Sequence, residues 1–198
     1  MKPNITISAA LLAYCAAAAP AFAHTGVGHT HGFVYGFLHP IGGLDHVLAM
    51  VAVGLFAAHL GGRALWRVPA TFVAFMAAGA MVGMRGVEIP FVEAGIATSI
   101  IVLGFMVALL ASLPVVVAMG LVGFFAVFHG HAHGFETPAD ASALSYALGF
   151  VAATASLHIA GVGVGLALSK AGASLSTRAA QLGGGVMAVT GVFLLAGG

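Results

Sequence analysis

Apolar residues fill most of the chain in long stretches, and the polar residues gather in short segments between them. Each stretch approaches or exceeds the roughly 20 residues that a transmembrane helix needs. A membrane β-barrel would instead show short strands of alternating hydrophobicity. The pattern therefore predicts an all-α integral membrane protein with about six transmembrane helices, near residues 33–60, 68–86, 89–112, 114–131, 143–169 and 178–197.

The first apolar stretch is interrupted by the sequence HPIGGLDH at residues 39–46. Proline lacks a backbone N–H and kinks a helix, and Gly42 and Gly43 follow Pro40 closely. Non-helical backbone at membrane depth is tolerated only where it packs on protein or lines a water-filled cavity. We therefore expect the first helix to be broken at Pro40, within a single six-helix domain that spans residues 24–198.

Composition excludes a water-soluble fold. Hydrophobic residues make up 61% of the 198 residues, charged residues 6%, and the mean hydropathy is +1.13. Soluble domains carry about 25% charged residues. The net charge is +1 and the chain has no basic patch, so nucleic acid is not an expected partner, whereas the lipid bilayer is.

The N-terminus has the pattern of a secretory signal peptide over residues 1–23. Lys2 precedes an apolar core, and Ala21-Phe22-Ala23 is a small-x-small cleavage site that would leave His24 as the new N-terminus. An uncleaved first helix is the alternative; Tyr14 argues against lipidation of Cys15. Because Cys15 is the only cysteine, the processed chain would have neither a disulfide nor a thiolate metal site.

The charge pattern predicts an orientation. With the processed N-terminus outside, the inner loops carry or border Arg63, Arg67, Lys170 and Arg178, and the outer loops carry Arg85. This distribution fits the positive-inside rule. We expect a multi-pass protein of a bacterial cytoplasmic (inner) membrane, with its N-terminus outside.

Eight ionisable residues within or at the ends of these segments are candidate metal ligands. An aspartate at the centre of a membrane helix costs roughly 2.5–3.5 kcal/mol to insert, and such residues usually mark ion pathways. Histidine nitrogens with carboxylate oxygens suit divalent transition metals. We expect Asp45 and His46 at the membrane midplane and the others there or in the outer half. The set is His39, Asp45, His46, Glu93, His129, His133, Glu136 and His158.

Each residue also has a structural alternative. His158 could bond a neighbouring helix, Asp45 could cap a half-helix, and Glu93 could lie at the interface. His129 and His133 are four residues apart and share a helix face, whereas His131 is off that face and expected in solvent; His59 is expected at the interface. His24, His29 and His31 are expected to form an external segment that captures metal.

Three segments resemble the HupE/UreJ family of nickel permeases, which are linked to hydrogenase and urease maturation. Residues 39–55, HPIGGLDHVLAMVAVGL, resemble its signature HPxxGxDHxxxMxxVG. FHGHAHGFE (128–136) and GFVAATASLHIAG (149–161) resemble two further family segments. The resemblance covers essentially the whole processed chain. It implies metal handling by His39, Asp45, His46, Glu93, His129 and Glu136, with His133 and His158 as companions.

The expected function is a secondary permease for Ni²⁺ or Co²⁺, with no permanent cofactor and no enzymatic activity. The chain has no G-x-x-x-x-G-K-[ST] motif, so it does not hydrolyse ATP through one. The alternative is an intramembrane zinc-dependent hydrolase with Glu93 as the candidate general base. A membrane-anchored metal sensor would need a soluble domain that the chain lacks. A homo-oligomer or a periplasmic metal donor is a further possible partner.

Overall fold

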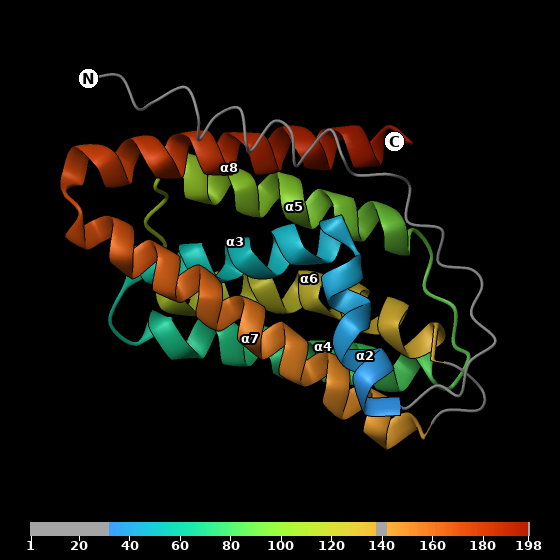
Figure 1. Ribbon diagram of the computed structural model, residues 1–198. Helices are drawn as coiled ribbons and strands as arrows, with labels where there is room; N and C mark the ends of the chain where they lie inside the picture. The colour runs from blue at the N-terminus through green and yellow to red at the C-terminus, as the bar shows by residue number, and fades with distance from the viewer. Residues whose placement is uncertain (1–31, 138–141, 198) are drawn as a thin grey trace.

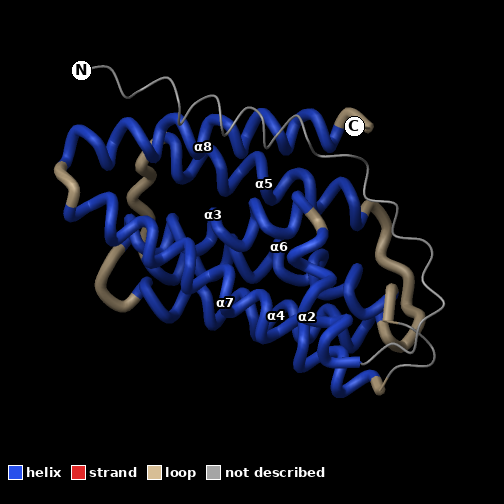
Figure 2. The backbone as a smooth tube through the Cα atoms, viewed as in Figure 1, coloured by secondary structure: helices blue, strands red, loops and turns tan. Residues whose placement is uncertain are grey.

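The computed structural model describes residues 32–137 and 142–197, and this part of the chain is entirely helical apart from short connections (Figures 1 and 2). The predicted all-α class is confirmed. The signal peptide and the capture histidines His24, His29 and His31 lie outside the described residues. The helices are α2 (Gly32–Gly42), α3 (Leu44–Leu60), α4 (Ala64–Gly83), α5 (Val92–Ala108), α6 (Val115–Phe135), α7 (Ala143–Lys170) and α8 (Ala173–Leu195).

The first predicted span is two helices, α2 and α3, which meet at an angle of 82°. The break lies at Gly43, not at Pro40 as the sequence suggested. Pro40 sits inside α2, where it removes only its own donor, and the helix continues to Gly42. Gly43 then takes an extended conformation (φ −94°, ψ 118°) as the N-cap of α3. In Figure 1, α3 runs along the same direction as the long helices, and α2 crosses them steeply.

Four of the described helices, α4, α6, α7 and α8, are long and apolar enough to cross a membrane, and the bent pair α2 and α3 makes a fifth candidate. Helix α5 is also apolar but has 17 residues, about 25 Å at 1.5 Å per residue. That length is at the lower limit for a span. The described structure is thus that of a multi-pass membrane protein, and the count of six spans stays a prediction.

Close helix pairs are built on glycines. On α6, Gly130 faces the Met76 carbonyl and Gly134 faces the Ala80 carbonyl of α4, and a Cβ at either position would overlap that backbone. Glycines four residues apart let two helix backbones approach closely in a membrane. Gly54 of α3 lies in the same way against the backbone of α7 at His158. These contacts fix the rotation of α6 and α7, and therefore the direction of their histidines.

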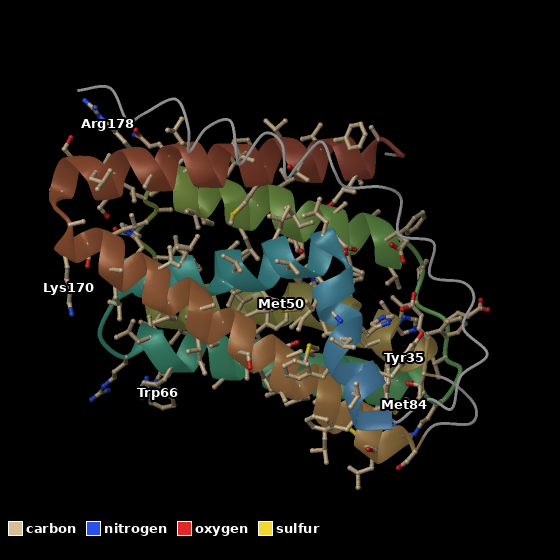
Figure 3. The ribbon with its side chains drawn as sticks, viewed as in Figure 1. Tyr35, Met50, Trp66, Met84, Lys170 and Arg178 are labelled. Atoms are coloured by element: carbon tan, nitrogen blue, oxygen red, sulfur yellow. The ribbon has the colours of Figure 1, made fainter. Side chains whose placement is uncertain are left out.

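The two ends of the bundle differ in charge. Figure 3 shows Trp66, Lys170 and Arg178 at one end and Tyr35 and Met84 at the other. Arg63 and Arg67 flank Trp66 in the chain, and Arg85 follows Met84. Of the five Lys and Arg residues that the structure describes, four therefore lie at one end, which we call the basic end.

Candidate metal site

Four imidazoles from three helices gather beneath the bend between α2 and α3. His46 of α3 has its ring centroid 5.0 Å from that of His129 and 4.6 Å from that of His133, both on α6. His39 of α2 lies 5.1 Å from His133. We call His39, His46, His129 and His133 the histidine cluster. It lies toward the end opposite the basic end, because His46 is in the first turn of α3 and His133 in the last turn of α6.

The local sequence explains this gathering. His129 and His133 are four residues apart, so they project from the same face of α6. The glycines between and after them, Gly130 and Gly134, pack on α4 and leave the histidine face turned toward α3. The break at Gly43 directs α2 across this face, which brings His39 above His133.

Asp45 is bonded to its neighbour His46. The Asp45 Oδ1 atom lies 2.8 Å from His46 Nδ1 and accepts a second bond, also 2.8 Å, from the His46 backbone N–H. Because a carboxylate only accepts, Nδ1 carries a hydrogen, and in the neutral ring the lone pair is then on Nε2. Metal-binding histidines commonly donate their other ring N–H to a carboxylate in this way. Asp45 lies in the first turn of α3 and is not its N-cap, which is Gly43.

Gly43 provides the space for this pair. A Cβ at residue 43 would lie 2.7 Å from Asp45 Oδ1 and 3.1 Å from His46 Nδ1. Any side chain at this position would therefore push the Asp45 carboxylate away from the imidazole. At Gly42, by contrast, a Cβ would meet no other described residue within 4 Å.

Ser99 of α5 is a member of the site that the sequence analysis missed. Its fully buried hydroxyl lies 2.9 Å from His129 Nε2 and 2.6 Å from the Ile96 carbonyl oxygen. An isolated serine in the apolar segment ATSIIV was the available signal, but small polar residues in membrane helices commonly bond their own backbone. Only the packing of α5 on α6 shows that this one meets a histidine.

His39 and Glu136 are in direct polar contact at the edge of the cluster. His39 Nε2 lies 2.8 Å from Glu136 Oε2, and the Glu136 side chain is about half exposed (51%) while that of His39 is 20% exposed. Tyr35 and Tyr146 rings flank His39. This pair joins α2 to the C-terminal end of α6, where the cluster meets the surface.

His158 of α7 is buried but lies beyond the cluster. The Phe72 ring separates it from His129, with centroid distances of 5.1 Å to His158 and 5.6 Å to His129. The expected hydrogen bond from His158 to a neighbouring helix is not among the contacts of the described residues, since both ring nitrogens are buried without a partner there.

Three other expectations have different outcomes. Glu93 is exposed in the first turn of α5, and within the described chain its carboxylate makes no hydrogen bond or ion pair to the cluster. The expectation that His131 is in solvent is wrong. Because α6 packs closely on α4 there, His131 is 4% exposed, and its Nε2 bonds the Val87 carbonyl at 2.7 Å. His59 is exposed near the basic end and bonds the Leu110 carbonyl at 2.8 Å.

Buried ring nitrogens without partners are the strongest chemical feature of the site. Over residues 32–137 and 142–197, no partner is found for His46 Nε2, His129 Nδ1 or both nitrogens of His133, although all are buried. Burying such groups unpaired costs free energy. Two imidazoles on one ion, with bonds of about 2.1 Å, have centroids roughly 5 Å apart, which is the separation seen here. The described side chains nevertheless do not bring three His, Cys, Asp or Glu residues into one metal-holding group.

Fold and site together define a multi-pass helical membrane protein with imidazoles buried beneath a bent helix. A family model described as "HupE / UreJ protein" matches residues 12–194. "Protein HupE" from Rhizobium leguminosarum bv. viciae is 46% identical over 184 residues, which are 92% of this chain and 94% of that protein. No solved structure matches the chain at a significant level. The chain belongs to the HupE/UreJ family, as the sequence motifs indicated.

Proposed function

We propose that the protein is a secondary permease for a divalent transition metal ion, with Ni²⁺ as the first candidate and Co²⁺ as the second. The observation that carries this proposal is a group of buried imidazole nitrogens, on His46, His129 and His133, that have no partner among the described residues and lie beneath the bend of a membrane helix. Neutral nitrogen ligands favour transition metals over Mg²⁺ and Ca²⁺, which prefer oxygen. Membership of the HupE/UreJ family, which is linked to nickel and cobalt transport, supports the same conclusion.

In this proposal the ion enters at the pair of His39 and Glu136, where the Glu136 side chain is half exposed. It then reaches the nitrogens of His133, His46 and His129, and Asp45 offsets part of its charge through His46. The next ligand is His158 of α7, on the other side of the Phe72 ring. Glu93 adds negative charge at the outer rim. His24, His29 and His31 capture the ion outside.

The proposed path implies a small movement. Because the cluster does not hold three ligands around one point, the ion must draw the rings together or pass between pairs of them. The bend at Gly43 is the element that can supply this movement, since α2 carries His39 and α3 carries His46.

The proposed topology has six spans, with the processed N-terminus outside a bacterial inner membrane. The basic end, with Arg63, Arg67, Lys170 and Arg178, would face the cytoplasm. The histidine cluster would then open outward. No support has emerged for the zinc-dependent hydrolase, whose candidate general base, Glu93, is not bonded to the cluster in the described structure.

Uptake of radioactive Ni²⁺ into proteoliposomes tests the proposal. The wild-type protein is expected to transport nickel, Co²⁺ to compete, and Mg²⁺ in large excess to compete poorly. His133→Ala is expected to lose transport, with His59→Ala as the control, because His59 is exposed and lies near the basic end. Uptake no faster than in protein-free vesicles would contradict the proposal.

A further inference from the structure

The direction in which Ser99 donates its hydroxyl hydrogen determines which nitrogen of His129 carries the ring hydrogen. Ser99 Oγ lies 2.6 Å from the Ile96 carbonyl oxygen and 2.9 Å from His129 Nε2. Two oxygens at 2.6 Å need a hydrogen between them, and a hydroxyl has one hydrogen. The Ser99 hydroxyl therefore donates to Ile96, and its oxygen accepts a hydrogen bond from His129 Nε2–H.

This bond selects one tautomer of His129. With the hydrogen on Nε2, the lone pair is on Nδ1, which is buried and has no partner in the described structure. A doubly protonated ring would bury a second N–H without an acceptor, which is unfavourable. His46 has the opposite arrangement, because its Nδ1–H donates to Asp45 and its lone pair is on Nε2. The two rings are 5.0 Å apart and nearly perpendicular, at 89°.

We propose that Ser99 is a positioning residue for the transported ion: it holds His129 as the Nε2–H tautomer, so that Nδ1 is the metal-binding atom. Asp45 holds His46 as the Nδ1–H tautomer, so that Nε2 is its metal-binding atom. The two imidazoles therefore bind through different nitrogens. The inference rests on the proposed function. Its physical basis is that the hydrogen bond made by one ring nitrogen determines which nitrogen is free for a metal.

A structural role for Ser99 is the competing explanation. Serines in helices often donate to a carbonyl one turn earlier, and Ser156 of α7 does this to Ala152 at 2.8 Å. Ser156 is exposed and has no histidine partner among the described hydrogen bonds. Ser156→Ala is therefore a matched control, because it removes the same kind of helix bond without touching an imidazole.

Nitrogen NMR of the imidazoles tests the tautomer directly. The full chain is purified without metal in lipid nanodiscs with ¹⁵N-labelled histidine, and His129 is assigned through correlation with its own backbone. The wild-type protein and Ser156→Ala are expected to show a protonated Nε2 and an unprotonated Nδ1. Ser99→Ala is expected to shift His129 toward the other tautomer or a mixture, and Ser99→Thr to retain the original one. A wild-type His129 with its hydrogen on Nδ1 would overturn the inference.

Ni²⁺ titration of the same proteins tests the consequence. His24, His29 and His31 are replaced by alanine in every sample, so that only inner ligands contribute. Loss of the residue that is hydrogen-bonded to a metal-binding histidine weakens the affinity for the metal about 10- to 100-fold. This decrease in Ni²⁺ affinity is expected for Ser99→Ala but not for Ser156→Ala. Unchanged affinity in Ser99→Ala would overturn the inference while leaving the permease proposal intact. If the wild-type protein binds no nickel, the proposed function fails and the metal role of Ser99 fails with it, whatever the tautomer.

Discussion

Asp45 and His46 are neighbours in the chain, and their side chains are bonded to each other, which changes the role of each residue. The sequence suggested two separate candidate metal ligands. The bond between Asp45 Oδ1 and His46 Nδ1 leaves the other ring nitrogen, Nε2, which is buried and has no partner in the described structure. At the residue scale, Asp45 would thus act on the ion of the proposed function through His46.

Asp45→Asn tests this role. The substitution keeps an oxygen that accepts the imidazole hydrogen but removes the negative charge that strengthens the bond. The apparent affinity for Ni²⁺ in proteoliposome uptake is expected to fall about 10- to 100-fold, as for other residues behind a metal-binding histidine. His46→Ala should abolish uptake. Wild-type kinetics in Asp45→Asn at equal protein content would show that Asp45 has no part in ion binding.

At the element scale, the bend between α2 and α3 shapes the candidate site, because Gly43 at its centre leaves room for the Asp45–His46 pair. Gly43→Ala places a methyl group against the Asp45 carboxylate, a side-chain end that can move. We expect the protein to fold and insert normally but to lose most of its nickel uptake.

The neighbouring glycine supplies the control for this prediction. The added methyl group of Gly42→Ala meets no other described residue within 4 Å, so uptake should stay at the wild-type level. Uptake rates and amounts of membrane-inserted protein are measured together for both variants. Equal uptake by the two variants would show that the Asp45–His46 pair does not depend on the space at Gly43.

Packing of α4 on α6 sets the direction of the histidine face and gives a stability prediction. Gly130→Ala forces a Cβ into the Met76 carbonyl, and overpacking of this kind typically destabilises by about 1–3 kcal/mol. Its Tm in detergent is therefore expected to fall by several degrees. Gly120→Ala on the same helix meets nothing within 4 Å and should not lower the Tm. An unchanged Tm in Gly130→Ala would mean that the two helices are less closely packed than described.

At the scale of the whole molecule, charge is asymmetric along the bundle. The basic end carries four of the five described Lys and Arg residues, and the histidine cluster lies toward the opposite end. If the basic end faces the cytoplasm, the cluster receives its ion from outside, which is the direction that uptake requires.

Cysteine labelling tests this orientation. In a background with Cys15→Ser, Ser174→Cys lies in the first turn of α8 at the basic end, and Val87→Cys lies in the loop at the other end; both side chains are exposed. A membrane-impermeant maleimide is expected to label Val87→Cys in intact cells and Ser174→Cys only after the cells are opened. The reverse pattern would invert the topology.

Sequence reasoning predicted the helical class, the interrupted first span and the histidines that gather, since these follow from local apolar runs and spacing. It misplaced the break by three residues, because a proline near the end of a helix can be accommodated while an extended glycine cannot continue the helix. Ser99 and the burial of His131 were missed because both depend on how α5 and α4 pack on α6. The rotation of each helix about its axis is set by contacts between segments that are distant in the chain, which local sequence patterns do not reveal.

X-ray absorption at the nickel edge tests the central claim most directly, namely that the buried imidazoles bind the transported ion. The sample is the purified chain with His24, His29 and His31 replaced by alanine, loaded with one equivalent of Ni²⁺. We expect a nitrogen and oxygen shell with the scattering pattern of at least two imidazoles, reduced by one imidazole in His46→Ala and unchanged in His59→Ala. A shell without imidazole scattering, or one unaltered by both His46→Ala and His129→Ala, would contradict the account.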